Sequence, residues 1–157
     1  MLRLGLGVAA VVVVLDQLVK LLLIAFIGGQ NRTLAVWPFL DLVMVWNRGV
    51  SFGFFNSAAA GEIQRWILVA LSLGVVAALV LWLRRIGDRR LALAVGLIVG
   101  GAIGNVLDRV RFGAVADFFY FHLGDYYWPA FNLADSAIVA GVGFLLYDSL
   151  FRRPEQG

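Results

Sequence analysis

The chain of 157 residues contains no cysteine and only one histidine, His122. Without cysteine it can form no disulfide, thiol nucleophile or cysteine-based metal site. A single histidine excludes a metal centre built from several histidines, and any serine–histidine catalysis would have to run through His122. These absences remove several common kinds of active site before any motif is considered.

Charged residues are also scarce, at 15% of the chain, whereas hydrophobic residues make up 62%. A typical soluble domain carries about 25% charged residues, so this chain has too little polar surface to cover a globule in water. The composition therefore predicts a membrane protein. The net charge of +3 is expected to set its orientation in the membrane, and no nucleic-acid partner is expected.

Four apolar stretches are candidates for membrane spans, at residues 4–27, 66–83, 91–107 and 131–147. A helix needs about 20 residues, with a range of about 17–25, to cross a bilayer. The runs are continuously apolar and do not alternate, so they predict an all-α bundle of four transmembrane helices and not a β-barrel. The first stretch is longer than the h-region of a cleaved signal peptide and is interrupted by charges, so a retained helix is expected.

The connecting segments predict an orientation. The loop "RRIGDRR" (84–90), the N-terminus and the tail "FRRPEQG" are short and rich in arginine. Arginine beside the spans marks the cytoplasmic side, so both termini are expected there. The segments near 28–65 and 108–130 are then expected on the outer side. With no internal repeat or linker, residues 1–157 are expected to form one membrane-embedded domain.

The first outer segment, residues 28–65, differs from the spans. It is rich in β-branched and aromatic residues, and Pro38, Gly49 and Gly53 interrupt it. This pattern predicts short strands and turns.

Asp16 and Lys20 are polar residues within the first span, four positions apart and so on one helix face. A charge within a bilayer costs at least a few kcal/mol, so the pair is expected to face the bundle interior or water. Two interpretations stay open. The residues form a salt bridge that merely tolerates burial, or they form an ion pair beside an active site.

The third span ends in "GGAIGNVLDRVRFG", with Asn105, Asp108 and Arg109 on one helix face. A purely structural ion pair is one interpretation, but three polar groups at a membrane border favour a site. Gly101 and Gly104 are small residues that allow another helix to approach closely.

Asn132 and Asp135 stand at the start of the fourth span, where Asn132 can act as the N-cap and Asp135 can complete the cap. Capping does not explain Asp117, which has apolar and aromatic neighbours. If folding brings Asp117 and Asp135 together, the two carboxylates cannot both ionise easily and the pair holds one proton. The ionised member can take a proton from water while the protonated member polarises a carbonyl, which is a peptide-hydrolysing arrangement.

Other functions remain open on these residues alone. Intramembrane Asp and Lys also serve as relays in a small ion or proton transporter. In a non-catalytic membrane assembly protein the carboxylates would be only caps and salt bridges. A third alternative is an Mg²⁺ or Ca²⁺ site formed by Asp108, Asp117 and Asp135.

Five motifs, in this order along almost the entire chain, resemble bacterial lipoprotein signal peptidase, or signal peptidase II. They are "DQLVK", "NRGVSFGFF", "GGAIGNVLDR", "VADFF" and "FNLADSAI". The resemblance implies a membrane aspartic endopeptidase with four transmembrane helices, an extracytoplasmic β-cradle and a short surface helix. It implies cleavage of diacylglyceryl-modified prolipoproteins just before the lipid-modified Cys.

The resemblance also implies roles for individual residues. The catalytic dyad is Asp117 and Asp135, no metal or other cofactor takes part, and Ala116 replaces a Val often seen in the family. The resemblance implies that six residues bind the substrate: Asn47, Asn105, Arg109, Asn132, Asp16 and Lys20. It implies a supporting structural role for Asp108, Gly101 and Gly104. The expected protein is a monomer in the bacterial cytoplasmic (inner) membrane, in contact with lipid, with its active site toward the extracytoplasmic face.

Overall fold

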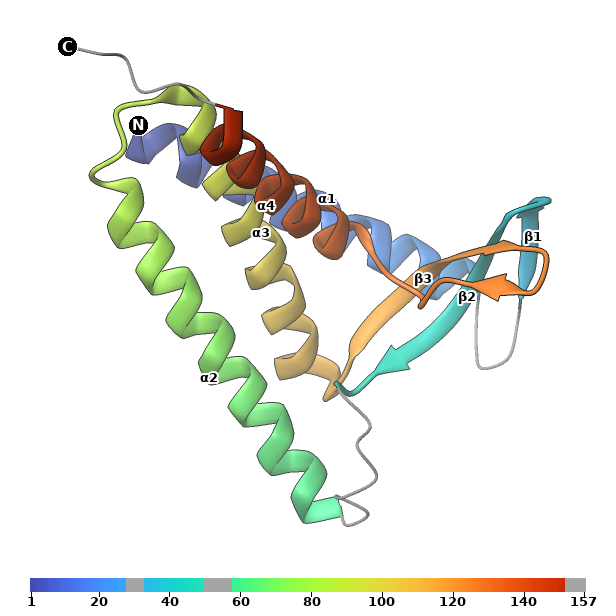
Figure 1. The fold of residues 1–157 in the computed structure, drawn as a ribbon. Coiled ribbons are helices and arrows are strands. Elements are labelled where there is room, and N and C mark those ends of the chain that lie inside the picture. Colours follow the sequence, from blue (N-terminus) through green and yellow to red (C-terminus); the bar gives the residue numbers. More distant parts are fainter. Residues whose placement is uncertain (28–32, 50–57, 152–157) are drawn as a thin grey trace.

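The computed structural model describes residues 1–27, 33–49 and 58–151. Long helices dominate these ranges, and a small sheet lies at one end (Figure 1). The helices are α1 Leu2–Ile27, α2 Ala58–Leu83, α3 Arg89–Phe112 and α4 Leu133–Phe151. All four are long and apolar enough to cross a membrane. The predicted fold class, four membrane helices with a small sheet, is confirmed.

The helices extend past the apolar runs that predicted them. α2 begins eight residues before the predicted residue 66, and α3 continues five residues beyond 107. An apolar run marks only the part of a helix that lies in the hydrocarbon region of the bilayer. The backbone hydrogen bonds of the helix continue through polar residues at its ends, so the helix is longer than the run. At its start α3 is capped by Asp88, whose Oδ1 accepts the N–H of Arg90 at 2.7 Å. At its end Gly113 adopts the left-handed conformation that commonly stops a helix.

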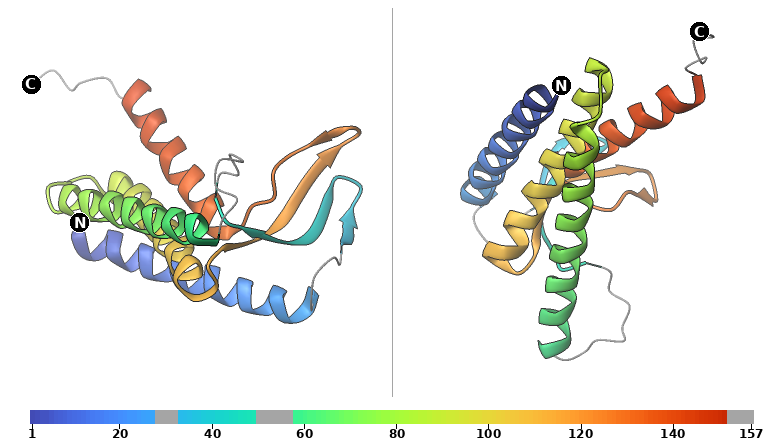
Figure 2. Two further views of the ribbon diagram at one scale, coloured as in Figure 1. Left: turned by 90° about the horizontal axis from the view of Figure 1, so that it is seen from below. Right: turned by 90° about the vertical axis from the view of Figure 1, so that its left-hand side faces the viewer.

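α3 is the central helix of the bundle and packs against the other three helices. In its apolar window 67% of the residues are buried, against 11–22% in the other helices. Glycines allow the close approach. A Cβ on Gly100 would lie 2.8 Å from the Ala9 carbonyl oxygen of α1, and one on Gly141 of α4 would lie 2.6 Å from the Ala94 oxygen of α3. α2 packs mainly on α3, where Arg65 Nη2 donates to the Val110 oxygen at 2.8 Å, and α4 leans away from α2 (Figure 2).

The sheet has four antiparallel strands in the order β1-β2-β3-β4. Their bounds are β1 Leu34–Trp37, β2 Leu40–Asn47, β3 Val115–Leu123 and β4 Tyr126–Tyr127. The first two confirm the strands predicted in 28–65. Strands β3 and β4 are not predicted by the local sequence pattern, because the run from Val115 to Leu123 is apolar and aromatic without a clear alternation of polar residues.

A separate surface helix is not seen among the described residues of the first outer segment. Residues 50–57, which include most of the "NRGVSFGFF" motif, lie outside the described residues. From Ala58 onward the chain forms the single helix α2.

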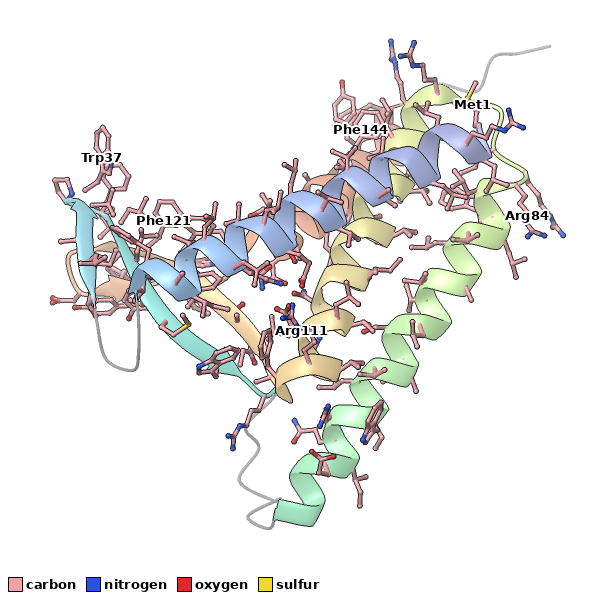
Figure 3. All side chains as sticks on the ribbon, turned by 180° about the vertical axis from the view of Figure 1, so that it is seen from behind. Met1, Trp37, Arg84, Arg111, Phe121 and Phe144 are labelled. Carbon is pink, nitrogen blue, oxygen red and sulfur yellow. The ribbon has the colours of Figure 1, made fainter. Side chains whose placement is uncertain are left out.

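The sheet and the basic loop lie at opposite ends of the molecule. In Figure 3, Trp37 and Phe121 mark the sheet, while Met1 and Arg84 lie at the far end of the helices. The N-terminus and the end of α4 lie on that far side (Figure 1). The polar residues named in the motifs gather between these extremes, where α3 meets β3 and the start of α4.

Candidate active site

Asp117 lies near the start of β3. Its neighbours Ala116 and Phe118 are fully buried in a cluster with Ile27 of α1. Because successive side chains of a strand point to opposite faces, Asp117 points away from this cluster. The pairing of β2 with β3 brings Asn47 beside it, and Asn47 Nδ2 donates to Asp117 Oδ2 at 3.0 Å.

Asp135 occupies the first turn of α4, where Asn132 is the N-cap. Asn132 Oδ1 accepts the backbone N–H of Asp135 at 2.9 Å, and Asp135 Oδ2 accepts the N–H of Asn132 at 3.3 Å. This reciprocal arrangement satisfies two N–H groups, and a negative charge there is favourable. The predicted cap therefore exists, and it leaves Asp135 Oδ1 available for another partner.

A backbone bridge between Phe119 and Phe131 brings the two aspartates close. Phe119 N–H donates to the Phe131 oxygen at 2.9 Å, and Phe131 N–H donates to the Phe119 oxygen at 3.1 Å. Phe119 is two residues after Asp117, and Phe131 directly precedes Asn132. The intervening hairpin is closed at its base, so the start of α4 lies against the start of β3.

Two asparagine side chains connect the aspartates. Asn132 Nδ2 donates to Asp117 Oδ1 at 2.7 Å and to Asn105 Oδ1 at 3.2 Å. Asn105 Nδ2 in turn donates to Asp135 Oδ1 at 2.8 Å. With the contacts described above, each of the four carboxylate oxygens accepts an N–H. The structure thus brings together Asn47, Asn105, Asn132 and both aspartates.

The protonation of Asp117 is shifted by this environment. Burial raises the pKa of Asp117 to about 6, and the negative charge of nearby Asp135 adds to the rise. Hydrogen bonds from Asn47 and Asn132 oppose the rise, as does the positive charge of Lys20. A carboxyl group that titrates near neutrality can hold or release a proton during a reaction.

Arg109 lies one turn beyond Asn105 on α3 and is half-buried. Its charge interacts electrostatically with Asp135 and Asp117. Nη1 donates to the Asn105 backbone oxygen at 3.4 Å, and the buried Nε has no hydrogen-bond partner within residues 1–27, 33–49 and 58–151. The site therefore contains a buried donor without a partner close to both carboxylates.

Asp16, Lys20 and Asp108 form a buried ion cluster behind the asparagines. Lys20 Nζ lies 2.8 Å from Asp16 Oδ2 and 2.6 Å from Asp108 Oδ2. The predicted pairing of Asp16 with Lys20 is therefore present, and Asp108 joins it from α3. Gln17, which the sequence analysis did not single out, donates Nε2 to Asp108 Oδ1 at 2.9 Å and to Asp16 Oδ2 at 3.2 Å. The position of Gln17 within the motif "DQLVK" is the sequence feature from which its role in the cluster could have been predicted.

Gly101 and Gly104 lie where α3 contacts the rest of the site. A Cβ on Gly101 would collide with the backbone oxygen of Ala134 in α4. One on Gly104 would lie 2.6 Å from Asp16 Oδ2. The two glycines thus allow α4 and the ion cluster to approach α3 closely, as their size predicted.

The alternative metal site requires Asp108, Asp117 and Asp135 to face one point. Asp108 instead faces Lys20 and the backbone N–H of Ala116, at 3.2 Å. In the described part of the chain, no three His, Asp or Glu residues are grouped so that they could hold a metal ion.

Comparison with known proteins gives a consistent result. Residues 8–151 match the family model for signal peptidase (SPase) II. The lipoprotein signal peptidase of Methylorubrum extorquens (strain PA1) is 49% identical over 155 residues, which cover 97% of this chain and 88% of the relative. That of Burkholderia mallei (strain SAVP1) is 46% identical and covers 94% and 87%, respectively.

Solved structures are also similar to this fold. A bacterial membrane enzyme solved at 1.9 Å resolution has a TM-score of 0.81 and 27% identity, covering 95% of this chain and 94% of the other. A second, solved at 2.3 Å resolution, has a TM-score of 0.77 and covers 98% and 93%. The family match spans most of the chain, including all four helices and the clustered polar residues. The chain therefore belongs to the signal peptidase II family of multi-pass bacterial membrane proteins.

Proposed function

We propose that this protein cleaves signal peptides from prolipoproteins with Asp117 and Asp135 as its catalytic dyad. The observation that carries the proposal is the connection of the two carboxylates through Asn132 and Asn105, with hydrogen bonds of 2.7 and 2.8 Å to the aspartates. The names of the relatives, lipoprotein signal peptidases, support this substrate class. They favour a peptidase over a transporter or a non-catalytic assembly protein.

When the dyad of the free enzyme holds one proton, that proton resides on Asp117. Asp117 is 1% exposed, whereas Asp135 is half-buried, and burial disfavours the charged form of a carboxyl group. Asp135 is then the base that takes a proton from the attacking water. Asp117 donates its proton to the carbonyl oxygen of the scissile peptide bond as the water oxygen bonds to the carbon.

The tetrahedral intermediate breaks down by the reverse proton movements. Asp117 takes a proton back from a hydroxyl group of the intermediate while the C–N bond breaks. Asp135 transfers the proton it took from water to the leaving nitrogen. The products are a carboxyl group and a free amine, and both aspartates return to their starting protonation states.

The polar groups around the dyad hold the substrate backbone. Arg109 Nε is a buried donor without a partner among the described residues, so a substrate carbonyl can accept from it. Asn47, Asn105 and Asn132 carry further amide donors and acceptors at the same site. The substrate is the diacylglyceryl-modified precursor, cut just before the modified Cys, because acyl chains in the bilayer hold the scissile bond near the membrane surface.

The site faces the extracytoplasmic side of the cytoplasmic membrane. Arginines of the 84–90 loop mark the opposite end of the molecule as cytoplasmic (Figure 3). Every residue of the proposed site belongs to one chain, so a monomer suffices for catalysis. Residues 1–157 act as one domain.

Cleavage of a lipid-modified precursor by the purified full chain tests this proposal. Asp117→Asn and Asp135→Asn should each remove turnover while precursor binding persists. Gly143→Ala is the matched control, because a Cβ there meets nothing within 4 Å. A precursor without the diacylglyceryl group should be cut poorly by the wild type. Normal turnover by either Asn variant would refute the dyad, and chelator-sensitive hydrolysis would favour the metal alternative.

A further inference from the structure

The buried ion cluster of Asp16, Lys20 and Asp108 contacts the backbone on both sides of the dyad. We propose that Asp16 and Asp108 are positioning residues, each holding the peptide N–H directly before one dyad aspartate, with Lys20 setting the spacing between them. This inference rests on the proposed function of the dyad. It replaces the expectation, drawn from the family resemblance, that Asp16 and Lys20 bind substrate.

Asp108 holds the β3 side. Its Oδ2 accepts the N–H of Ala116 at 3.2 Å, and Ala116 directly precedes Asp117. Both Ala116 and Asp108 are fully buried, so no water can replace this acceptor. A buried N–H without an acceptor costs about 1–3 kcal/mol. The start of β3 is thus held to α3 at the residue before the proton-carrying aspartate.

Asp16 holds the α4 side. Its Oδ1 accepts the N–H of Ala134 at 3.0 Å, and Ala134 directly precedes Asp135. This N–H lies in the first turn of α4, where the backbone has no acceptor within the helix. Ala134 and Asp16 are both fully buried. The start of α4 is thus held to α1, in the same way as β3 is held to α3.

Lys20 joins the two holding carboxylates. Its Nζ bridges Asp16 and Asp108 at 2.8 and 2.6 Å and lies 3.4 Å from Asn105 Oδ1. Two buried carboxylates this close would repel each other without a cation between them. Gln17 adds a neutral bridge to both. The positions of the two peptide N–H groups are therefore set by one compact cluster.

The cluster is closed to the substrate. Asp16, Lys20 and Asp108 are exposed by at most 2%, and their polar atoms already have protein partners. Each holding bond lies one residue from a dyad aspartate, so a shift of the amide moves that aspartate directly. Misplacing reacting groups by about 1 Å can cost about 100-fold in rate.

The two carboxylates use their oxygens differently, which allows a sharp test. Asp108 Oδ2 accepts from both Lys20 and Ala116, so the single oxygen of an Asn can serve both. The NH₂ of that Asn then replaces Oδ1, so only the hydrogen bond from Gln17 is lost. Asp16 uses Oδ2 for Lys20 and Oδ1 for Ala134. An Asn at position 16 must turn its NH₂ toward one of these donors. Asp108→Asn should therefore keep its bonds to both Lys20 and the Ala116 N–H, whereas Asp16→Asn should lose one of its two.

The experiment measures kcat and KM for a lipid-modified precursor, per mole of folded full-length enzyme, in Asp16→Ala, Asp16→Asn, Asp108→Ala and Asp108→Asn. We expect kcat to fall about 100-fold in both Ala variants while KM changes by less than about threefold. The kcat of Asp108→Asn should be at least about tenfold higher than that of Asp108→Ala, whereas the kcat of Asp16→Asn should equal that of Asp16→Ala. If the Ala variants do not fold, the comparison of the two isosteric Asn variants decides.

Asp88→Ala is the control for lost stability, because it removes the cap of α3 far from the site. Its kcat per folded enzyme should equal that of the wild type. Wild-type kcat in the folded Ala variants, or equal recovery by both Asn variants, would overturn the inference. Asp117→Asn, assayed in parallel, separates the two proposals. If it is inactive while Asp108→Ala has wild-type kcat, only the positioning roles fail, whereas an active Asp117→Asn refutes the dyad itself.

Discussion

The side chains of Asn132 and Asp117 are joined by a hydrogen bond of 2.7 Å, from Nδ2 of the amide to Oδ1 of the carboxylate. The same asparagine caps α4 through its Oδ1, which accepts the N–H of Asp135. One residue therefore has a structural role and a proposed catalytic role, carried by different atoms of its amide. Substitutions can separate the two roles.

Asn132→Ser should keep the cap and lose the contact with Asp117. Both this variant and Asn132→Ala lose the Nδ2 hydrogen bonds to Asp117 and Asn105, so both should be less stable than the wild type. Because a serine hydroxyl can cap a helix, Asn132→Ala should be less stable than Asn132→Ser by about 1 kcal/mol. Both variants lack the amide donor to Asp117, so both should lose about 100-fold in kcat. Thermal unfolding in detergent and precursor cleavage measure the two effects. Serine restoring both stability and rate would show that the amide contact is dispensable.

The raised pKa of Asp117 predicts a dependence of stability on pH. Its pKa is about 6 in the folded chain against 3.8 for the free group, so the folded state binds more protons between these values. Stability should therefore decrease as pH rises from about 4 to 6, by up to about 3 kcal/mol from this group. Asp117→Asn should remove that part of the decrease.

Unfolding free energies of the wild type and Asp117→Asn at pH 4 and pH 7 provide the measurement. The exposed Asp125 on the β3–β4 turn supplies the control, because Asp125→Asn makes the same change from a carboxyl group to an amide outside the site. Parallel pH curves for wild type and Asp117→Asn would contradict the raised pKa.

Activity should also report the protonation of Asp117. If its protonated form donates to the scissile carbonyl, kcat/KM should decline as pH rises above about 6, since this ratio follows the ionisation of the free enzyme. The hydrogen bond from Asn47 lowers the pKa of Asp117. Asn47→Ala should therefore move the decline to higher pH, whatever it does to substrate binding. If kcat/KM of Asn47→Ala declined at the same pH as that of the wild type, a group other than Asp117 would be responsible for the decline.

Gly104 and Gly143 offer a matched pair of helical glycines. At Gly104 an added Cβ would lie 2.6 Å from Asp16 Oδ2, whereas at Gly143 it would meet nothing within 4 Å. Gly104→Ala should disturb the ion cluster and reduce both stability and kcat. Gly143→Ala should leave activity unchanged and stabilise the helix by up to about 1 kcal/mol. Equal behaviour of the two variants in unfolding and cleavage assays would show that the close approach at Gly104 is not needed.

The features of this protein that depend on local composition can be predicted from the amino-acid sequence. Long apolar runs predict four membrane helices because a bilayer requires backbone hydrogen bonds within each segment. Strands in 34–47 follow from β-branched residues broken by turn formers. The cap formed by Asn132 and Asp135 follows from their spacing. The family motifs indicated which polar residues belong together.

How those residues come together depends on contacts between segments that are distant along the chain. Asp117 lies on a strand that the local pattern did not reveal, and the Phe119–Phe131 bridge brings it to the start of α4. The pairing of Asp108 with Lys20, 88 positions apart in the printed sequence, depends on the close packing of α3 on α1. Hydropathy and spacing describe neighbours along the chain, whereas strand register and helix packing are set by contacts between distant segments.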